Sequence, residues 1–429
     1  MSQPLDRRRF LENSAAATVA FTAWSSAKAL RAAESPGEKI VVGVMGINGR
    51  GRALADGFAS VGGCEVAYLC DVDEKALDRA KATFSTQQTR RPDVVKDFRR
   101  ILDDKSVDAL VIAAPDHWHA PATILGCAAG KHVYVEKPLS HNPREGELAV
   151  AAARKYNKVV QMGSQRRSVP GVVEAIKRVH AGEIGKVLFA RGWYNNARPT
   201  IGIGKPAPVP ATLDYNLWQG PAPEREYHDN YVHYNWHWFW HWGTGELGNN
   251  GIHSLDICRW GLNVDYPRRV VSGGGKYRFE DDQETPDTHT VTYDFGDKAI
   301  TWEGRSWHRH GFEGSAFGIM FYGDQGSVFI DGGVYKVLDP KDKLIAEGKS
   351  SFSHDPHLLN FLDCIRTGNR PAADVEEAHK STMLCHLGNI AYRTGHTVNL
   401  DPQTHQIVDD PAAAALWGRE YRQGWEPKV

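Results

Sequence analysis

The stretch KIVVGVMGINGRGRALADGF, which begins at Lys39, constrains the fold more than any other part of the chain. An apolar strand runs into a glycine-rich turn, and a helix with one apolar face follows. Gly46, Asn48 and Gly51 occupy the three glycine positions of the dinucleotide-binding pattern GxGxxG, with asparagine in the middle place. Asparagine tolerates left-handed backbone better than other non-glycine residues, and Gly49 adds a further site of close approach. The turn therefore predicts a pyrophosphate site at a helix N-terminus.

A second apolar strand, CEVAYLC, ends directly before Asp71. An acidic residue at this place accepts hydrogen bonds from the adenosine ribose hydroxyls and repels a 2'-phosphate. We therefore expect NAD, in preference to NADP, as the cofactor. Asp73 either shares this role or caps the next helix, and we favour the cap.

Strands and helices go on alternating after this point. Helices are expected at 75–84 and 121–130, and uniformly apolar strands at 108–115 and 132–138. This alternation predicts an α/β Rossmann domain with a doubly wound parallel sheet over residues 38–155, whose ligands bind at the carboxyl ends of the strands. The residues expected to bind the cofactor are Gly46, Asn48, Gly49, Arg50, Gly51, Asp71, Pro115, Asp116, His119, Glu136, Lys137 and Gln165.

The pattern changes past Tyr156. Strand-like segments lie at 187–195, 269–279, 287–295, 298–307, 317–323 and 327–331. Helices are expected near Asp355 and at 373–392, and the proline-rich stretch 204–223 should be an ordered loop. Residues 156–429 therefore predict a C-terminal α+β domain with a largely antiparallel open sheet, which we expect to contribute to substrate binding. Its last helices and tail are expected to pack back on the first domain.

The segments AAPDHWHA and VEKPL, with GNNGIHSLD far downstream, resemble the Gfo/Idh/MocA oxidoreductases, which include glucose-fructose oxidoreductase and inositol dehydrogenase. The resemblance covers Lys39 to Arg393. It implies that Lys137 reaches the nicotinamide ribose and the substrate hydroxyl, and that His253 is an acid/base. Many inositol-dehydrogenase-like members have aspartate four residues before this histidine. The chain departs from them with Asn249, which can hold a sugar hydroxyl as donor and acceptor.

The chemistry of the residues agrees with these roles. Oxidation of a carbinol requires a group that accepts the hydroxyl proton, and a histidine or a lysine with a lowered pKa is suited to it. Lys137 follows an apolar strand and precedes Pro138, which favours a site over a solvated surface charge. For His253 the residues alone leave a structural buried histidine equally open. Asp256, three residues later, is expected to support the helix that begins near His253 or to orient His253.

The stretch NWHWFWHW places tryptophan at every second position from Trp236 to Trp242. A strand would set these rings on one face and His237 on the other. A sugar ring offers apolar C–H faces, so we expect one or two of the rings to contact substrate, although packing is the alternative for each. The candidate substrate-binding residues are Asn249, Trp236, His237 and Trp218. No metal is expected, because no carboxylate or cysteine completes a ligand set with the histidines.

The N-terminus places Arg7, Arg8 and Arg9 before Phe10, and an apolar run and small residues follow. This order resembles a twin-arginine export signal over residues 1–33, with a disordered tail as the alternative. We therefore expect a periplasmic or otherwise exported protein. The six scattered cysteines should be free and buried. The net charge of -1 indicates neither a nucleic acid nor a membrane partner.

Free NAD is scarce outside the cytoplasm, so an exported enzyme must hold its cofactor tightly and return the hydride on the spot. The expected function is an NAD(P)-dependent oxidation of a CH–OH group in a sugar, sugar derivative or cyclitol. Two alternatives stay open. One is a redox-neutral NAD-dependent glycosidase that uses transient ring oxidation and elimination. The other is a carbohydrate-binding module with a vestigial nucleotide site. The resemblance also implies a homo-oligomer, a dimer or tetramer, formed through the open sheet face.

Overall fold

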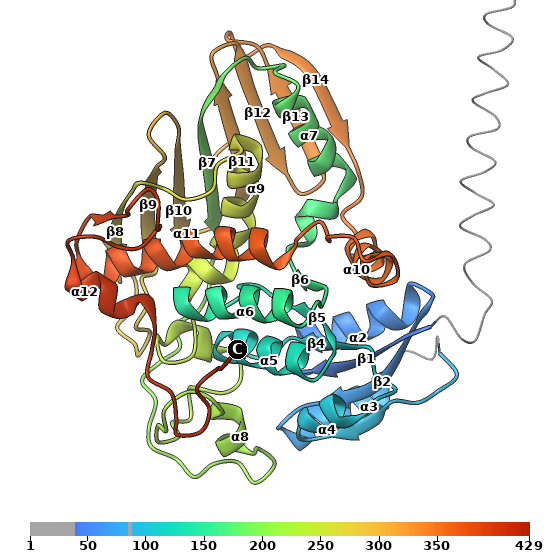
Figure 1. Cartoon of the computed structure of the whole chain (residues 1–429). Coiled ribbons are helices and arrows are strands. Elements are labelled where there is room, and N and C mark those ends of the chain that lie inside the picture. The colour runs from blue at the N-terminus through green and yellow to red at the C-terminus, as the bar shows by residue number, and fades with distance from the viewer. Residues whose placement is uncertain (1–38, 85–87) are drawn as a thin grey trace, which may run out of the picture.

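The computed structural model describes residues 39–84 and 88–429, so the expected export signal lies outside the described residues. The chain forms two sheets (Figure 1). The first is wholly parallel with the order β3-β2-β1-β4-β5-β6, which confirms the predicted doubly wound sheet. Its strands are β1 (Ile40–Met45), β2 (Cys64–Cys70), β3 (Asp93–Val95), β4 (Ala109–Ile112), β5 (His132–Val135) and β6 (Val160–Met162). β6 lies past residue 155, where this domain was expected to end.

Helices cover both faces of the parallel sheet. α2 (Arg50–Ser60) and α3 (Glu74–Thr83) share one apolar cluster with α10 (Asp355–Thr367). On the other face lie α4 (Arg99–Asp103), α5 (Asp116–Ala128) and α6 (Pro143–Lys155). The buried strands therefore read as continuous apolar runs, as parallel strands with two covered faces require.

Helix α5 begins at Asp116, earlier than the expected start at residue 121. The helix therefore contains Pro121, which lacks the N–H that would bond to the carbonyl oxygen of His117. The Arg419 guanidinium near the C-terminus donates to that oxygen at 2.8 Å instead. The returning tail, which ends beside α5 (Figure 1), thus satisfies the carbonyl that the proline leaves free.

The second sheet has the order β14-β13-β12-β11-β7-β10-β9-β8-β15. Its strands are β7 (Val187–Asn195), β8 (Arg269–Gly275), β9 (Thr288–Asp294), β10 (Ala299–Arg305), β11 (Phe317–Gly323), β12 (Gly326–Asp331), β13 (Val334–Leu338), β14 (Leu344–Lys349) and β15 (Val398–Asn399). Only the β7–β10 pair is parallel among these described strands, so the largely antiparallel sheet is confirmed. Three of its strands, β13 to β15, were not expected from the sequence.

One face of the second sheet packs on α7 (Pro170–His180), α9 (Ile252–Leu262) and α11 (Val375–Thr394). Along β10, Ile300 and Trp302 are buried toward this layer, whereas Thr301 and Glu303 are half-buried on the other face. α11 also packs on α6 and so joins the two sheets (Figure 1).

The tryptophan-rich stretch is not a strand, so that prediction was wrong. Residues Asn235–Trp238 form the short helix η2, and the chain then turns back on itself. Gly243 permits this turn, because a Cβ atom there would lie 2.3 Å from the Cα of His237. Trp242 is fully buried in an aromatic cluster with Trp218. Tertiary packing of the large rings therefore decides the local conformation.

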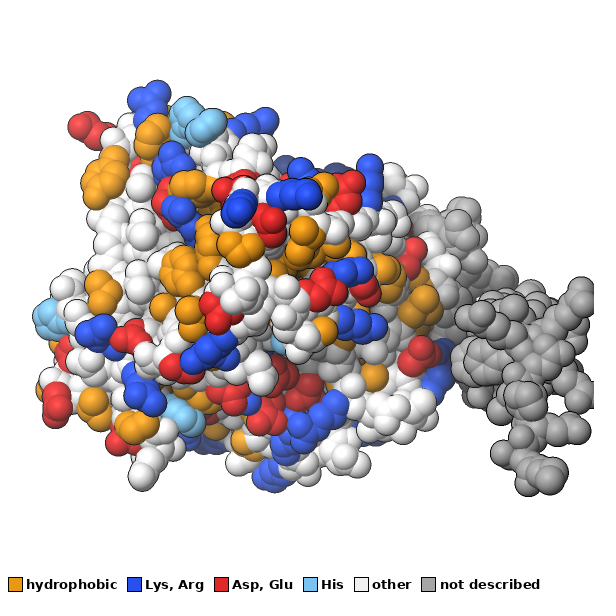
Figure 2. All heavy atoms as spheres, turned by 90° about the horizontal axis from the view of Figure 1, so that it is seen from above, with side chains coloured by type: hydrophobic (Ala, Val, Ile, Leu, Met, Phe, Trp, Pro, Cys, Tyr) orange, Lys and Arg blue, Asp and Glu red, His pale blue; other side chains and the backbone are white. Residues whose placement is uncertain are grey.

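The surface shows no dominant charge on the face in Figure 2, where acidic and basic side chains are interspersed around a central group of hydrophobic ones. All six cysteines are buried and free, as expected. None of the helices in the described part of the chain is long and apolar enough to cross a membrane.

Replacing Gly51 by alanine should destabilise the fold. A Cβ atom at Gly51 would lie 1.8 Å from the carbonyl oxygen of Gly46, where the backbone cannot give way. We expect the free energy of unfolding, measured in urea, to fall by about 2 kcal/mol. Gly273→Ala is the control, because nothing lies within 4 Å of its added methyl group. An equal loss in both variants would contradict the close packing of Gly51.

Candidate functional site

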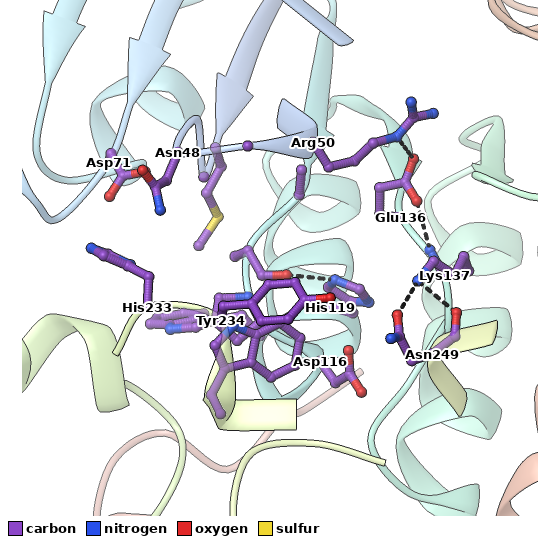
Figure 3. Close-up of a pocket in the computed structure, with 18 of the residues that line it drawn as sticks. Asn48, Arg50, Asp71, Asp116, His119, Glu136, Lys137, His233, Tyr234 and Asn249 are labelled. Atoms are coloured by element: carbon purple, nitrogen blue, oxygen red, sulfur yellow. Dashed lines mark hydrogen bonds and ion pairs between the residues drawn. The ribbon is translucent and has the colours of Figure 1, made fainter. Parts of the chain in front are cut away.

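A cavity of about 600 Å³ runs along the carboxyl edge of the parallel sheet. Its other walls come from the segment between β7 and α9, of which residues 196–245 are here called the covering loop, and from the start of α9. Figure 3 shows Asp71 and Asn48 at one end of the cavity and Lys137 and Asn249 at the other. The predicted site residues that line it are Gly46, Asn48, Gly49, Arg50, Asp71, Pro115, Asp116, His119, Glu136, Lys137, Gln165, Trp218, Trp236, Asn249 and His253.

The glycine turn forms one end of the cavity. Gly46 has a φ of +82°, and a Cβ atom there would lie 2.7 Å from backbone atoms of Ala113 and Ala114. The left-handed residue is therefore Gly46, and Asn48 adopts no such conformation. Gly51, predicted to bind the cofactor, does not line the cavity. Its close approach to Gly46 instead lets α2 start directly at the turn.

Two aspartates lie beyond the turn. Asp71 is buried, and its two carboxylate oxygens accept the N–H groups of Ile47 at 2.8 Å and Asp73 at 3.0 Å. Burial raises the pKa of Asp71, and these two hydrogen bonds oppose the rise. Asp73 caps α3 by accepting the N–H of Lys75, which confirms the capping interpretation. Its other oxygen pairs with His233 of the covering loop at 2.9 Å.

Glu136, at the end of β5, is fixed from two sides. Arg50 donates to its carboxylate at 2.7 Å and Gln165 donates to the same oxygen at 3.1 Å. Burial alone would raise the pKa of Glu136, but the Arg50 guanidinium outweighs it and holds the pKa below the ordinary value. The carboxylate is therefore charged and immobile beside Lys137 (Figure 3).

Asp116 and His119 occupy the first turn of α5. Burial raises the pKa of Asp116, which accepts the hydroxyl of Thr244 at 2.6 Å. The two ring nitrogens of His119 face the carbonyl oxygens of Pro138 at 2.5 Å and Ala114 at 2.8 Å. His119 therefore links the ends of β4 and β5 to the first turn of α5.

Lys137 lies at the end of the cavity opposite the glycine turn. Its ammonium donates to both oxygens of Asn249, the carbonyl at 2.8 Å and the side chain at 2.9 Å. Burial lowers the pKa of Lys137, while the charges of Glu136 and Asp116 oppose that shift. A lysine whose pKa is lowered in this way can exchange a proton with a bound hydroxyl group.

Asn249 lies in the π-helical turn η3 (Leu247–Gly251), and His253 follows in the first turn of α9. The ring Nδ1 of His253 has no hydrogen-bond partner among the described residues. Burial lowers the pKa of His253 well below its ordinary value, and Lys137 adds to the effect. The ring is therefore neutral near pH 7 and presents both a donor and an acceptor.

Asp256 supports α9 and does not orient His253. Its carboxylate accepts three hydrogen bonds from Arg167, at 2.8 and 3.0 Å to one oxygen and at 2.9 Å to the other, and one from the hydroxyl of Ser381 at 2.6 Å. These partners come from η1 (Gln165–Ser168) and α11. The buried pair thereby fixes the helix that carries His253 relative to both neighbouring elements.

The tryptophans divide between the cavity and the core. Trp236 lines the cavity, and so does the nine-tenths buried Trp218, whereas Trp242 does not. His237 was predicted to contact substrate, but the structure places it outside the cavity. Its ring is buried against Trp238 at a centroid distance of 3.9 Å. The reason is again the turn at η2, which replaces the alternating geometry of a strand.

Several further residues line the cavity. His233 and Tyr234, which the sequence offered as additional polar and aromatic contacts for a sugar, reach it from the covering loop, whereas Phe352 and His354, from the segment before α10, were not predicted. Arg166 also lines it, packs on Phe317 with its guanidinium 3.8 Å from the ring centroid, and has a pKa that burial lowers to about 10. In the sequence, only the position of Arg166 next to Gln165, a predicted cofactor-binding residue, could have pointed to it. Phe352 and His354 come from a segment that has no motif.

Metal ligation is not indicated in this part of the chain. The described residues contain no group of three histidine, cysteine or acidic side chains that could hold a metal ion. One ring nitrogen of His241 is instead 2.9 Å from the carbonyl oxygen of Pro223, within the covering loop.

Both halves of the chain match one protein family. Residues 40–164 match its NAD-binding Rossmann fold, and residues 201–427 match its C-terminal alpha/beta domain. The chain belongs to the Gfo/Idh/MocA oxidoreductase family. The predicted resemblance to this family is confirmed.

Two relatives illustrate the distance within the family. The inositol 2-dehydrogenase of Salmonella typhimurium is 29% identical over 229 residues, which cover 52% of this chain and 55% of that protein. A glycosyl hydrolase family 109 protein of Saccharopolyspora erythraea is 28% identical over 215 residues, 45% of this chain and 46% of that protein. The chain thus spans about half the length of the curated relatives it matches.

Solved structures show the same fold. The aldose-aldose oxidoreductase from Caulobacter crescentus superimposes with a TM-score of 0.66 at 20% identity, covering 84% of this chain and 100% of that one. A levoglucosan dehydrogenase in complex with NADH gives a TM-score of 0.66 at 17% identity, covering 84% and 99%. At these identities the likeness concerns the fold alone.

The residues present fit the dinucleotide that a Gfo/Idh/MocA Rossmann fold binds. Gly49 precedes α2 without a side-chain cap, and the first turn of this helix holds no acidic residue. The N–H groups at the start of α2 are therefore not taken by a side-chain cap and can bind a pyrophosphate. The fixed carboxylate of Asp71 lies at the same end of the cavity. Together these groups provide an anion site and a hydroxyl acceptor in the order that a dinucleotide requires.

Replacing His253 by glutamine should change how stability depends on pH. The pKa of His253 lies well below 6.5 in the folded protein because the ring is buried. Below that pH the unfolded chain binds a proton that the folded protein does not, so stability falls as the pH falls. We expect the free energy of unfolding to fall less steeply in the variant as the pH is lowered from 6.5 to about 5. The difference between the two slopes should be up to about 1.4 kcal/mol per pH unit. An unchanged slope would show that the folded protein protonates His253.

Proposed function

We propose that this protein is an NAD-dependent oxidoreductase that oxidises a CH–OH group of a sugar, sugar derivative or cyclitol. The observation that carries the proposal is the placement of Lys137. Its buried ammonium is held by both oxygens of Asn249 in the same cavity as the glycine turn. The names of matched relatives, inositol 2-dehydrogenase and levoglucosan dehydrogenase, support this class of substrate.

Each group at the lysine end has a distinct role. A nicotinamide ring bound in the cavity supplies the hydride acceptor. Neutral Lys137 accepts the hydroxyl proton of the substrate, and the Asn249 side chain fixes the lysine and hydrogen-bonds a neighbouring hydroxyl. Neutral His253, with its unpartnered Nδ1, orients the substrate or relays the proton. Trp236 offers an apolar wall for the C–H face of a ring.

We propose that the cofactor is NAD and that bound NAD exchanges slowly with free NAD in solution. The carboxylate of Asp71 would accept ribose hydroxyls and repel a 2'-phosphate. Hydrogen bonds hold the covering loop over the end of the cavity at which Asp71 lies. The carbonyl of Thr212 accepts the N–H of Glu74 at 2.9 Å, Asp214 N–H donates to the carbonyl of Val72 at 2.9 Å, and His233 pairs with Asp73. Cofactor release therefore requires breaking several hydrogen bonds.

Slow exchange would suit an exported enzyme, and we propose that residues 1–33 act as a twin-arginine signal. The two sequential arginines, Arg7 and Arg8, are the testable part. Changing both to lysine should leave the protein in the cytoplasmic fraction of a host with a functional twin-arginine pathway. Unchanged fractionation of the double variant would contradict export by this route.

A redox-neutral NAD-dependent glycosidase is the second candidate. It is favoured by the match to a glycosyl hydrolase family 109 protein and by the loop that holds the cofactor in place. The same experiment separates the candidates. Purified protein is mixed with sugars, cyclitols and aryl glycosides while the near-ultraviolet absorbance of reduced nicotinamide and the release of aglycone are followed. Accumulated reduced nicotinamide or a carbonyl product indicates net oxidation, whereas aglycone release without either indicates bond cleavage. Neither signal would favour a carbohydrate-binding module.

Lys137→Met should reduce kcat/KM by about 100-fold or more, because the proton acceptor is lost. In the unchanged protein kcat/KM should rise with pH, since only neutral Lys137 accepts a proton. The midpoint should lie below 10.5 because burial lowers the pKa of Lys137. Lys75→Met, on the exposed side of α3, is the control. Full activity of Lys137→Met, with cofactor still bound, would reject this role.

His233→Ala should release the cofactor faster. The variant loses the hydrogen bond to Asp73, a contact that closes the covering loop over the cavity. We expect the dissociation rate of NAD, followed by fluorescence after dilution, to rise about tenfold. His228→Ala is the matched control, because His228 belongs to the same loop but does not line the cavity. Equal rates in both variants and the parent would mean that the loop does not limit release.

A further inference from the structure

A second cavity of about 270 Å³ lies behind the covering loop. It shares no lining residue with the main cavity. Its walls come from the start of α6, from α11, from the end of the covering loop and from the C-terminal segment. The residues on which the argument rests are Arg393, Arg419, His141, Trp240, Ile390 and Leu416.

The walls of this cavity hold more cationic side chains than acidic side chains that pair with them. The side chain of Arg393 makes no hydrogen bond or ion pair with any described residue, and its guanidinium lies 5.1 Å from the ring centroid of Trp240. Arg419 uses one terminal nitrogen to bind Glu145 at 2.7 Å, while its Nε and other terminal nitrogen have no partner among the described residues. Among the described residues, Glu145 is the one carboxylate that pairs with these two guanidinium groups, and the charge of Glu284 acts on Arg393 without an ion pair, so the two cations are only partly neutralised.

The remaining wall is neutral or apolar. His141 lies beside Arg419 in the cavity wall, both of its ring nitrogens lack partners among the described residues, and burial lowers its pKa well below the ordinary value. The ring therefore adds a hydrogen-bond donor without adding a charge. Ile390, Leu416 and the face of Trp240 supply apolar surface. An inorganic ion would leave that surface without contacts, whereas a short organic anion would use it.

We propose that this second cavity binds a small organic carboxylate. The carboxylate group pairs with Arg393 and takes hydrogen bonds from the Arg419 side of the cavity, and the apolar part lies on Trp240 and Leu416. The guanidinium fork of arginine matches the two oxygens of a carboxylate. This proposal is independent of the reaction in the main cavity.

Hydrogen bonds through Thr244 also connect the second cavity to the main cavity. Thr244 lines the second cavity, and its hydroxyl donates to Asp116 in the main cavity at 2.6 Å. The carbonyl of Thr244 accepts the side-chain N–H of Asn389, another residue of the second cavity, at 2.8 Å. Thr244 therefore lies between the second cavity and a carboxylate of the main cavity.

Isothermal titration calorimetry tests the proposal. The purified full-length protein is titrated with acetate, butyrate and malonate at constant ionic strength, and with chloride and sulfate as inorganic comparisons. We expect saturable binding of at least one organic carboxylate, tighter than either inorganic ion. Arg393→Gln should weaken that binding at least tenfold, since the only cation without a described ion-pair partner in the wall is lost.

Two further variants make the result decisive. Leu416→Trp should block binding by filling the apolar part while both guanidinium groups remain. Arg370→Gln is the matched control, because Arg370 is an exposed arginine between α10 and α11 that pairs with Glu376 at 3.6 Å and does not line the cavity. Absence of carboxylate binding, equal binding of chloride or sulfate, or unchanged binding by Arg393→Gln would each overturn the proposal.

Discussion

The hydrogen bonds from Lys137 to the two oxygens of Asn249 join the end of β5 to the turn before α9. Both residues are half-buried in the wall of the cavity, and burial lowers the pKa of the lysine. Breaking this contact would leave the ammonium without its two protein acceptors, so the contact stabilises the position of β5 relative to the turn before α9. The proposed acid–base group, Lys137, is therefore positioned by a contact that joins the two parts of the fold.

The rest of the site is built around that contact. Arg50 and Glu136 fix the lysine from the side of the parallel sheet, and Arg167 with Asp256 fixes α9 from the other side. The covering loop then closes the cavity with backbone bonds to the start of α3. Helices and strand ends thus hold the groups at the lysine end, while the covering loop forms another wall of the cavity.

How far the sequence predicts this arrangement depends on the range of the interactions. The turn at Gly46, the cap at Asp73 and β7 at Val187–Asn195 follow from local patterns, and the structure has them. The prediction for the tryptophan stretch was wrong because Trp242 and Phe239 pack into a cluster with residues 213–231 of the same covering loop, and the alternation within the stretch gives no sign of this packing. Pro121 lies within α5 because Arg419, almost three hundred residues later, satisfies the freed carbonyl.

The sequence by itself determined the alternation of apolar strands and helices, the glycine turn and the placement of Asp71 and Lys137 at the strand ends, because hydrophobic periodicity and backbone conformation are local properties. Only the tertiary structure decided which side chains meet. It placed His237 outside the cavity, brought Arg166, His233 and His354 into it, and formed the second cavity behind Thr244. Burial, desolvation and pKa depend on neighbours far away in the chain, and these exist only once the chain has folded.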